Sequence, residues 1–439
     1  MHSSFSEPNS PLKEVLGEKW QTASCSDLGD NYVKPGPLAK AKFNALRNKR
    51  EAIDRFLKKH KEEDLSLYID ELRDFAISSG GLVDDEFRAT IWPVLSANLV
   101  QNDDLDDVSS SYDSDFESAQ SDFDEETPIF EDQPELSLEE LKNHKEWNQV
   151  ELDVHRTLSR FPPNISDTHR DVLQTELIPL IVRVLSVNPR FNYYQGFHDI
   201  CLTVLLVCGE KDALPICSNL AKNGSFNNYL LKTLEKSVVR ELDLLYVILS
   251  RVEPTLEKVM RSVELGTMFG LSWPLTWFSH SLKQYQQPSR ILKNLSESFR
   301  IPRNPLKSSV NLQLIVRFFD VFLASSPLLP IYVSSAVVVY RRASILACER
   351  EMPFLHRLLT EMPTELPIDA IIKDAVYLSK LMPPCLLKTK YMNEYRKIVA
   401  KPPRTAVKTL PRYALQFMFV AGTVGAAASF FFFKQIHPL

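Results

Sequence analysis

The stretch that decides the fold is residues 137–163, SLEELKNHKEWNQVELDVHRTLSRFPP. Its apolar residues recur three and four positions apart, a spacing that places them on one face of an α-helix. They are Trp147, Val150, Val154 and Leu158. Ahead of them, Ser137 and Glu140 have the spacing of a capping box, in which each side chain binds the other residue's backbone amide. Helical order is therefore predicted from Ser137 to Phe161, where two prolines end it.

The same helical spacing continues on both sides of this stretch. It begins at about residue 39, recurs at 65–77 and 82–95, and resumes at about 171–187 and from 199 onward. No alternating strand pattern and no repeat of fixed period is evident, which argues against a sheet and against a solenoid. The sequence therefore predicts the all-α class.

Composition limits the classes of function. Glycine is scarce (12) and phenylalanine plentiful (25), which disfavours a glycine-rich dinucleotide-binding design. The net charge of −5 gives no reason to propose a nucleic-acid partner. The six cysteines form no CxxC pair and are expected to be small buried residues in a reducing compartment. No glycine-rich phosphate loop followed by Lys-Ser/Thr is present, so the chain is not predicted to bind a nucleotide itself.

Several segments differ from the helical domain, which is predicted over residues 39–390. Residues 1–38 are rich in Ser, Pro, Gly and Asn and are predicted to be a disordered tail. Residues 101–137 are acidic, serine-rich and free of Lys and Arg, which predicts a disordered insert. Residues 287–314 carry five Lys or Arg against one Glu, and are predicted to be a second, basic insert.

The C-terminal segment differs again. Residues 413–433, YALQFMFVAGTVGAAASFFFF, carry no charge and would span roughly 32 Å as a helix. The preceding linker, 391–412, is basic, so the positive-inside rule keeps it in the cytosol. We therefore expect a single-pass, tail-anchored protein with residues 434–439 as a short lumenal tail. Small residues spaced four apart in this span would allow a weak homodimer.

A second uncharged run, residues 321–340, is another candidate for a membrane span. It contains Pro327 and Pro330, which would break the hydrogen-bond ladder of a lone membrane helix. The prediction is instead two buried helices joined by a turn.

Two groups of polar residues have the chemistry of a catalytic site. Asp153 and Arg156 lie three apart and share one side of the predicted helix, where the Asp can direct the guanidinium. Gln195 precedes Gly196 in a connector, and its neutral amide can both donate to and accept from a water molecule. Taken singly, each group is explained equally well by an ordinary surface ion pair and a surface glutamine.

A metal site is the other possibility at the same place. His155 and His198 lie near Asp153 and Asp199 in the sequence. No HxxxH or HExxH pair is present, and His155 projects away from Asp153 on the helix. No metal is therefore predicted.

Four motifs that follow one another along the chain favour a catalytic site over an ordinary ion pair and a surface glutamine. They are Arg88-x-x-x-Trp92, Val150-x-x-Asp153-x-x-Arg156, Tyr193-x-Gln195-Gly196 and Arg317-Phe-Phe-Asp320. The second and third resemble the paired IxxDxxR and YxQG signatures of the TBC family of Rab GTPase-activating proteins, and the outer two are similar to structural motifs of that family. The resemblance covers most of residues 80–360. It implies that residues 39–390 form a multi-helix TBC domain.

The resemblance also implies a mechanism and a setting. Arg156 would act as an arginine finger and Gln195 would position the attacking water, with Asp153, Tyr193 and Gly196 in support. The chain would supply these residues in trans to a GTP-bound Rab-family GTPase, which carries the GTP and Mg²⁺, so no cofactor of its own is expected. The setting would be the endoplasmic reticulum membrane and early secretory traffic between endoplasmic reticulum and Golgi. A membrane-anchored Rab-binding scaffold without catalysis is the alternative, and a membrane-shaping protein a third possibility.

Overall fold

The computed structural model describes residues 37–100, 136–162, 166–283, 310–363 and 366–400. The helices of the first half are α2 (Pro37–Lys59), η1 (Leu65–Tyr68), α3 (Ile69–Ile77), α4 (Asp85–Ala97), α5 (Leu138–Lys142), α6 (Trp147–Leu158), α7 (Asp167–Ser186), α8 (Phe197–Cys208), α9 (Glu210–Lys222) and α10 (Gly224–Leu231). Those of the second half are η3 (Leu234–Lys236), α11 (Val238–Val252), α12 (Pro254–Ser262), η4 (Met268–Gly270), α13 (Ser272–Leu275), α14 (Ser279–Lys283), α16 (Val310–Leu323), α17 (Leu329–Tyr340), α18 (Arg342–Ala347), α19 (Met352–Thr360), α20 (Ile368–Leu381), α21 (Pro384–Leu386), η6 (Leu387–Tyr391) and α22 (Met392–Val399). The described residues contain no strand, and the all-α class is confirmed.

The decisive stretch folds into two helices, α5 and α6, rather than one. The capping box is present at the start of α5, where the backbone amide of Glu140 donates to Ser137 Oγ over 3.3 Å and that of Ser137 donates to the Glu140 carboxylate over 2.8 Å. On α6, the predicted stripe of Val150, Val154 and Leu158 is buried. This stripe packs α6 against α7 and α8.

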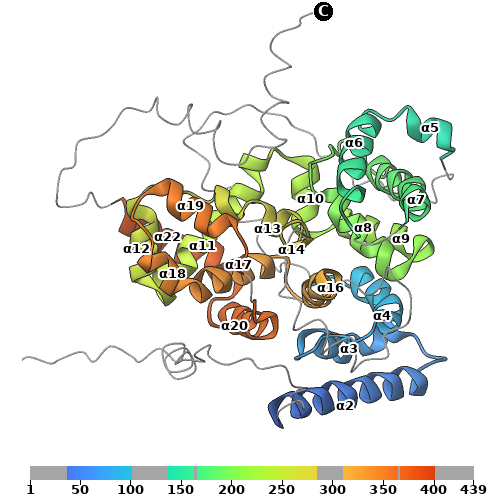
Figure 1. The fold of residues 1–439 in the computed structure, drawn as a ribbon, viewed down its shortest axis with the longest axis horizontal. Coiled ribbons are helices and arrows are strands. Elements are labelled where there is room, and N and C mark those ends of the chain that lie inside the picture. The colour runs from blue at the N-terminus through green and yellow to red at the C-terminus, as the bar shows by residue number, and fades with distance from the viewer. Residues whose placement is uncertain (1–36, 101–135, 163–165, 284–309, 364–365, 401–439) are drawn as a thin grey trace, which may run out of the picture.

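The helices gather in three neighbouring groups (Figure 1). Helices α5 to α9 form one group, in which α6, the helix that carries Arg156, packs against α7 and α8. Helices α3 and α4 pack against α16 in a second group, with α2 along its outer edge. The third group is built on α17, which packs against α11 and α20.

Helix α17 is buried from Leu329 to Val339 because it has no polar face. Its Ser334 and Ser335 hydroxyls donate to carbonyl oxygens one turn back, over 2.7 and 2.9 Å. Residues 321–340 therefore form the end of α16, a turn and α17, as predicted. Within the described residues, no helix combines the length and apolar character needed to cross a bilayer.

Helix boundaries differ from the predictions at three points. Helix α7 starts at Asp167 rather than near 171, because the Ser166 hydroxyl accepts from the backbone amide of His169 and caps it. Helix α16 begins at Val310 and so includes the last residues of the predicted insert 287–314. Helix α22 lies in the predicted linker 391–412, where Tyr395 donates to the buried Glu257 over 2.8 Å and holds the helix against α12.

Other predicted segments lie largely or wholly outside the described residues. They are the N-terminal tail 1–38, the acidic insert 101–137, most of the basic insert, the span 413–433 and the tail 434–439. These assignments stay predictions.

Candidate functional site

Arg156 lies on the outer face of α6 with its side chain 52% exposed. One of its terminal nitrogens, Nη1, donates to Oδ1 of Asp153 over 3.2 Å. The Asp153 side chain is 1% exposed, and its other oxygen accepts from Gln149 Nε2 over 3.3 Å. The i,i+3 spacing thus brings the two charges together as predicted, with one difference in environment. The carboxylate is buried and holds one terminal nitrogen of the Arg156 guanidinium, while the half-exposed side chain still reaches solvent.

The loop that carries Gln195 is tied to the same carboxylate. The Tyr193 hydroxyl donates to Asp153 Oδ2 over 3.1 Å, across a separation of 40 residues in the chain. Burial, and next the negative charge of Asp153, raise the pKa of Tyr193 well above its usual value, so the phenol keeps its proton and remains a donor. Gln195 is exposed, and its side chain makes no hydrogen bond to any other residue that the structure describes. The loop is therefore anchored while its glutamine faces outward.

Gly196 has a role that the sequence did not reveal. The neighbour that it allows to come close lies within the chain itself. Its φ is +120°, and a Cβ there would lie 2.8 Å from Cγ2 of Thr276. Beside it, the buried Tyr194 donates its hydroxyl proton to the carbonyl oxygen of Leu275 over 2.9 Å. Both contacts hold the loop against the last residue of α13 and the residue that follows it.

From the sequence, His198 was a candidate for metal binding alone. In the structure it lies on the first turn of α8, 2.7 Å from the Tyr193 hydroxyl and 2.9 Å from Oγ1 of Thr157. His155 instead contacts Gln174 on α7 over 3.0 Å. Across the described part of the chain, no group of three or more His, Cys, Asp or Glu side chains is arranged to hold a metal ion. Helix α8 is largely apolar, so a polar residue on it, such as His198, was the available signal for these contacts.

The outer two motifs form a separate, buried cluster. Asp320 is fully buried, and its carboxylate accepts from Nε and Nη2 of Arg88 over 3.0 and 3.2 Å. It also accepts from Trp92 Nε1 over 2.9 Å and from the backbone amide of Leu82 over 3.0 Å. The second carboxylate near Arg88, that of Asp85, lies 2.8 Å away. These contacts join α4 to α16.

Arg317 extends this cluster to two more helices. Its guanidinium donates to the carbonyl oxygens of Ala76, Ile77 and Ser78 at the end of α3, over 2.9 to 3.0 Å. Its Nε donates to Asp369 on α20 over 2.9 Å. Gly81 passes so close that a Cβ there would lie 2.4 Å from Asp320 Oδ2, which explains a glycine at this point. The cluster therefore holds helices together and presents none of its four motif residues to solvent.

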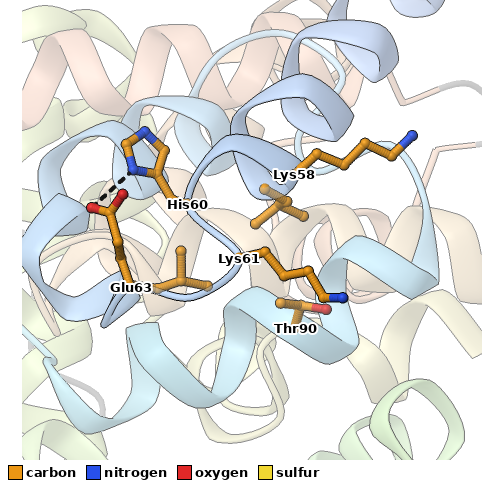
Figure 2. Close-up of a pocket in the computed structure, with 7 residues that line it drawn as sticks. Lys58, His60, Lys61, Glu63 and Thr90 are labelled. Atoms are coloured by element: carbon orange, nitrogen blue, oxygen red, sulfur yellow. Dashed lines mark ion pairs between the residues drawn. The ribbon is translucent and has the colours of Figure 1, made fainter.

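A surface cavity of about 290 Å³ lies elsewhere, between the end of α2 and α4. Figure 2 shows Lys58, His60, Lys61, Glu63 and Thr90 around it, with the His60–Glu63 pair at 3.3 Å. None of the predicted site residues lines this cavity. An exposed arginine that acts on another molecule requires no cavity of its own, and Arg156 stands on an open helix face.

Comparisons with known proteins agree with this architecture. Residues 85–295 match the profile described as "Rab-GTPase-TBC domain". TBC1 domain family member 20 of Mus musculus is 34% identical over 346 residues, which are 79% of this chain and 70% of that protein. The GTPase-activating protein gyp10 of Schizosaccharomyces pombe is 26% identical over 237 residues, 53% of this chain and 55% of that protein.

A solved structure resembles the fold. The Ypt/Rab-GAP domain of Gyp1p superposes with a TM-score of 0.50 at 14% identity, covering 76% of this chain and 99% of that one. At that identity the likeness concerns the helical arrangement alone. The family profile falls on α4 to α14, the part that contains Arg156 and Gln195, and the 34% identity to the mouse protein extends over most of both chains. This chain therefore belongs to the Rab-GTPase-TBC domain family.

Proposed function

We propose that this protein accelerates GTP hydrolysis on a Rab-family GTPase by presenting Arg156 and Gln195 to the nucleotide that the partner carries. One observation supports this above all others. The exposed Arg156 and the loop of the exposed Gln195 are both fixed to one buried carboxylate, that of Asp153. Two side chains that face solvent from a common anchor are suited to act together on a molecule outside the chain.

The chemistry follows from the two side chains. The fixed charge of Arg156 would stabilise oxygens that become more negative as the γ-phosphoryl bond breaks. Arginine fingers of GTPase systems contribute about 10³–10⁵ in rate, or roughly 4–7 kcal/mol. Gln195 would hold the attacking water, because an amide can donate and accept without titrating. GTP and Mg²⁺ belong to the partner, so the chain itself needs no cofactor.

The decisive experiment measures single-turnover GTP hydrolysis by a panel of GTP-loaded Rabs. The full chain is compared with Arg156→Ala and Gln195→Ala. We expect acceleration of at least one Rab by the wild type and its loss in both variants, with binding retained. Tight binding of a Rab with no acceleration on any of them would instead establish the scaffold.

The setting is a second part of the proposal. Residues 413–433 anchor the chain as a single-pass tail in the endoplasmic reticulum membrane, with the helical domain in the cytosol and a role in early secretory traffic. The uncharged length of this segment and its basic flank support the assignment. A reporter fused to residues 391–439 should reach that membrane, and the same reporter with Val424→Arg should not, because a charge at the centre of a span costs about 2.5–3.5 kcal/mol. Delivery of the unaltered reporter to mitochondria would contradict the placement.

A further inference from the structure

His198 forms a bridge between the two parts of the candidate site. Its side chain is 5% exposed and lies on the first turn of α8, directly after the Gln195 loop. Nδ1 lies 2.7 Å from the Tyr193 hydroxyl, and Nε2 lies 2.9 Å from Oγ1 of Thr157. Thr157 is the residue after Arg156 on α6. The ring therefore contacts both the loop of Gln195 and the helix of Arg156.

The direction of each hydrogen bond in this group follows from counting protons. The phenol of Tyr193 has one proton, and the carboxylate of Asp153, 3.1 Å away, can only accept. The Tyr193 proton therefore points at Asp153. The phenol oxygen is then left as an acceptor toward His198, so Nδ1 of His198 must carry a proton and donate it.

The other ring nitrogen, Nε2, can be in either of two states without changing this result. In the neutral ring it accepts from the Thr157 hydroxyl, whereas an imidazolium would donate from Nε2 and from Nδ1 alike. Oδ1 of Asp199 lies 3.3 Å from Nε2 and can accept from it when Nε2 carries a proton. Nδ1 is a donor to Tyr193 in both states.

This order of donors has a consequence for Asp153. A hydrogen bond donated to a phenol oxygen polarises the phenol and strengthens the bond that the phenol itself donates. Without the donor at Nδ1, the Tyr193 hydroxyl could rotate its proton toward the histidine, and the buried carboxylate would lose one of its partners. Asp153 would then hold Arg156 less firmly.

We propose that His198 is a positioning residue, which orients the Tyr193 hydroxyl toward Asp153 and so fixes Arg156 and the Gln195 loop in one arrangement. The inference rests on the proposed function for its kinetic readout. His198 touches neither the nucleotide nor the attacking water in this role. It acts through Tyr193.

Two substitutions of similar polarity test separately the contact of Nδ1 with Tyr193 and the contact of Nε2 with Thr157. In His198→Asn the amide nitrogen takes the approximate place of Nδ1 and can still donate to Tyr193. In His198→Gln the amide reaches the place of Nε2, so the contact with Thr157 can persist while the donor to Tyr193 is lost. We expect His198→Gln to lower the stimulated rate at saturating activator by about 10–100-fold, with little change in the activator concentration that gives half the effect. His198→Asn should stay within about threefold of wild type.

A second comparison excludes a role in packing alone. In a Tyr193→Phe background there is no hydroxyl to orient, so adding His198→Gln should cause no further loss of rate. If the two losses multiply, or if His198→Gln is as active as wild type, the positioning role is overturned. Thermal unfolding of each variant shows whether the chain is folded at the assay temperature.

A third measurement needs no GTPase. In the full chain labelled with ¹⁵N at its nine histidines, the ring of His198 should show a protonated Nδ1, with the signal assigned by its absence in His198→Asn. A bare Nδ1 would overturn the proposal whatever the kinetics. A wild-type chain that accelerates no Rab would refute the proposed function, whereas the protonation of Nδ1 would still decide whether His198 orients Tyr193.

Discussion

Tyr193 donates a hydrogen bond to the buried carboxylate of Asp153, and this contact joins two motifs that lie 40 residues apart in the chain. Asp153 in turn accepts from Arg156 over 3.2 Å. The carboxylate is therefore shared between the helix that bears the arginine and the loop that bears Gln195. A substitution at either partner of Asp153 should therefore alter the positions of both Arg156 and Gln195.

Arg156→Lys tests whether shape as well as charge is needed. Lysine keeps the positive charge but lacks the planar fork that can bind Asp153 and a phosphate oxygen at once. We expect the variant to lose most of the roughly 10³–10⁵-fold effect of an arginine finger in single-turnover GTP hydrolysis. Its free energy of unfolding should change by less than about 0.5 kcal/mol, because the replaced charge is half exposed. Near-normal acceleration by Arg156→Lys would argue against the finger.

Asp320→Asn should weaken the fold without touching the exposed site. The substitution leaves the Arg88 guanidinium buried beside a neutral amide. The new NH₂ group would also face the N–H group of Trp92 or of Leu82, each of which is itself a donor. Removing one partner of a buried pair costs about 3–5 kcal/mol, and we expect a loss of this order in urea unfolding. The control is Glu51→Gln in the exposed Arg47–Glu51 pair, whose atoms lie 3.6 Å apart, where about 0.5 kcal/mol or less is expected. Equal effects in the two variants would show that the Asp320 cluster contributes no more than a surface pair.

Local patterns predicted the helices around the site because their causes are local. The capping box at Ser137 and the stripe on α6 depend on residues three or four apart, and both are present. The pairing of Asp153 with Arg156 has the same origin. The break between α5 and α6 was missed, since residues 143–146 contain no proline or glycine to mark it.

The tertiary part of the site was not predictable in this way. Asp153 accepts a hydrogen bond from Tyr193, and the Cβ position of Gly196 is close to Thr276, which lies in a different part of the chain. No spacing rule connects such residues. The resemblance of motifs indicated the candidate residues, while their mutual contacts required the fold.

Gly196→Ala tests the approach of the loop to Thr276. Alanine is strained at a φ of +120°, and its methyl group would lie 2.8 Å from Cγ2 of Thr276. We therefore expect a loss of stability and displacement of Gln195, with reduced GTP hydrolysis. Gly209→Ala is the matched control, because Gly209 also has a positive φ (+79°) but no atom lies within 4 Å of the place that its Cβ would take. It should lose about 1–3 kcal/mol from backbone strain alone.

The clash itself can be separated from the strain by a second change at the neighbour. Thr276→Ser removes Cγ2 and keeps the hydroxyl that donates to the Ser272 carbonyl oxygen over 2.7 Å. In the Gly196→Ala background it should restore part of both stability and activity. Identical values with and without Thr276→Ser would assign the whole effect to the backbone.

Lys49 should make stability rise with pH in the weakly alkaline range. Burial, and next the charge of Arg317, lower the pKa of Lys49 from 10.5 to about 8, against the opposing effects of Asp320 and Asp369. Between these values the folded chain has released the Lys49 proton while the unfolded chain retains it, so raising the pH favours folding.

The variant Lys49→Met lacks this proton and removes its contribution. Urea unfolding of both chains at pH 7.5 and 9.5 should show the wild type gaining about 1 kcal/mol relative to the variant, less than the shift alone would give, because the side chain is partly exposed. Cys208, whose pKa burial raises, is present in both chains, so its contribution to the pH dependence cancels in the difference. If the difference in unfolding free energy between the two chains stays constant or falls as the pH rises, Lys49 remains charged in the folded chain.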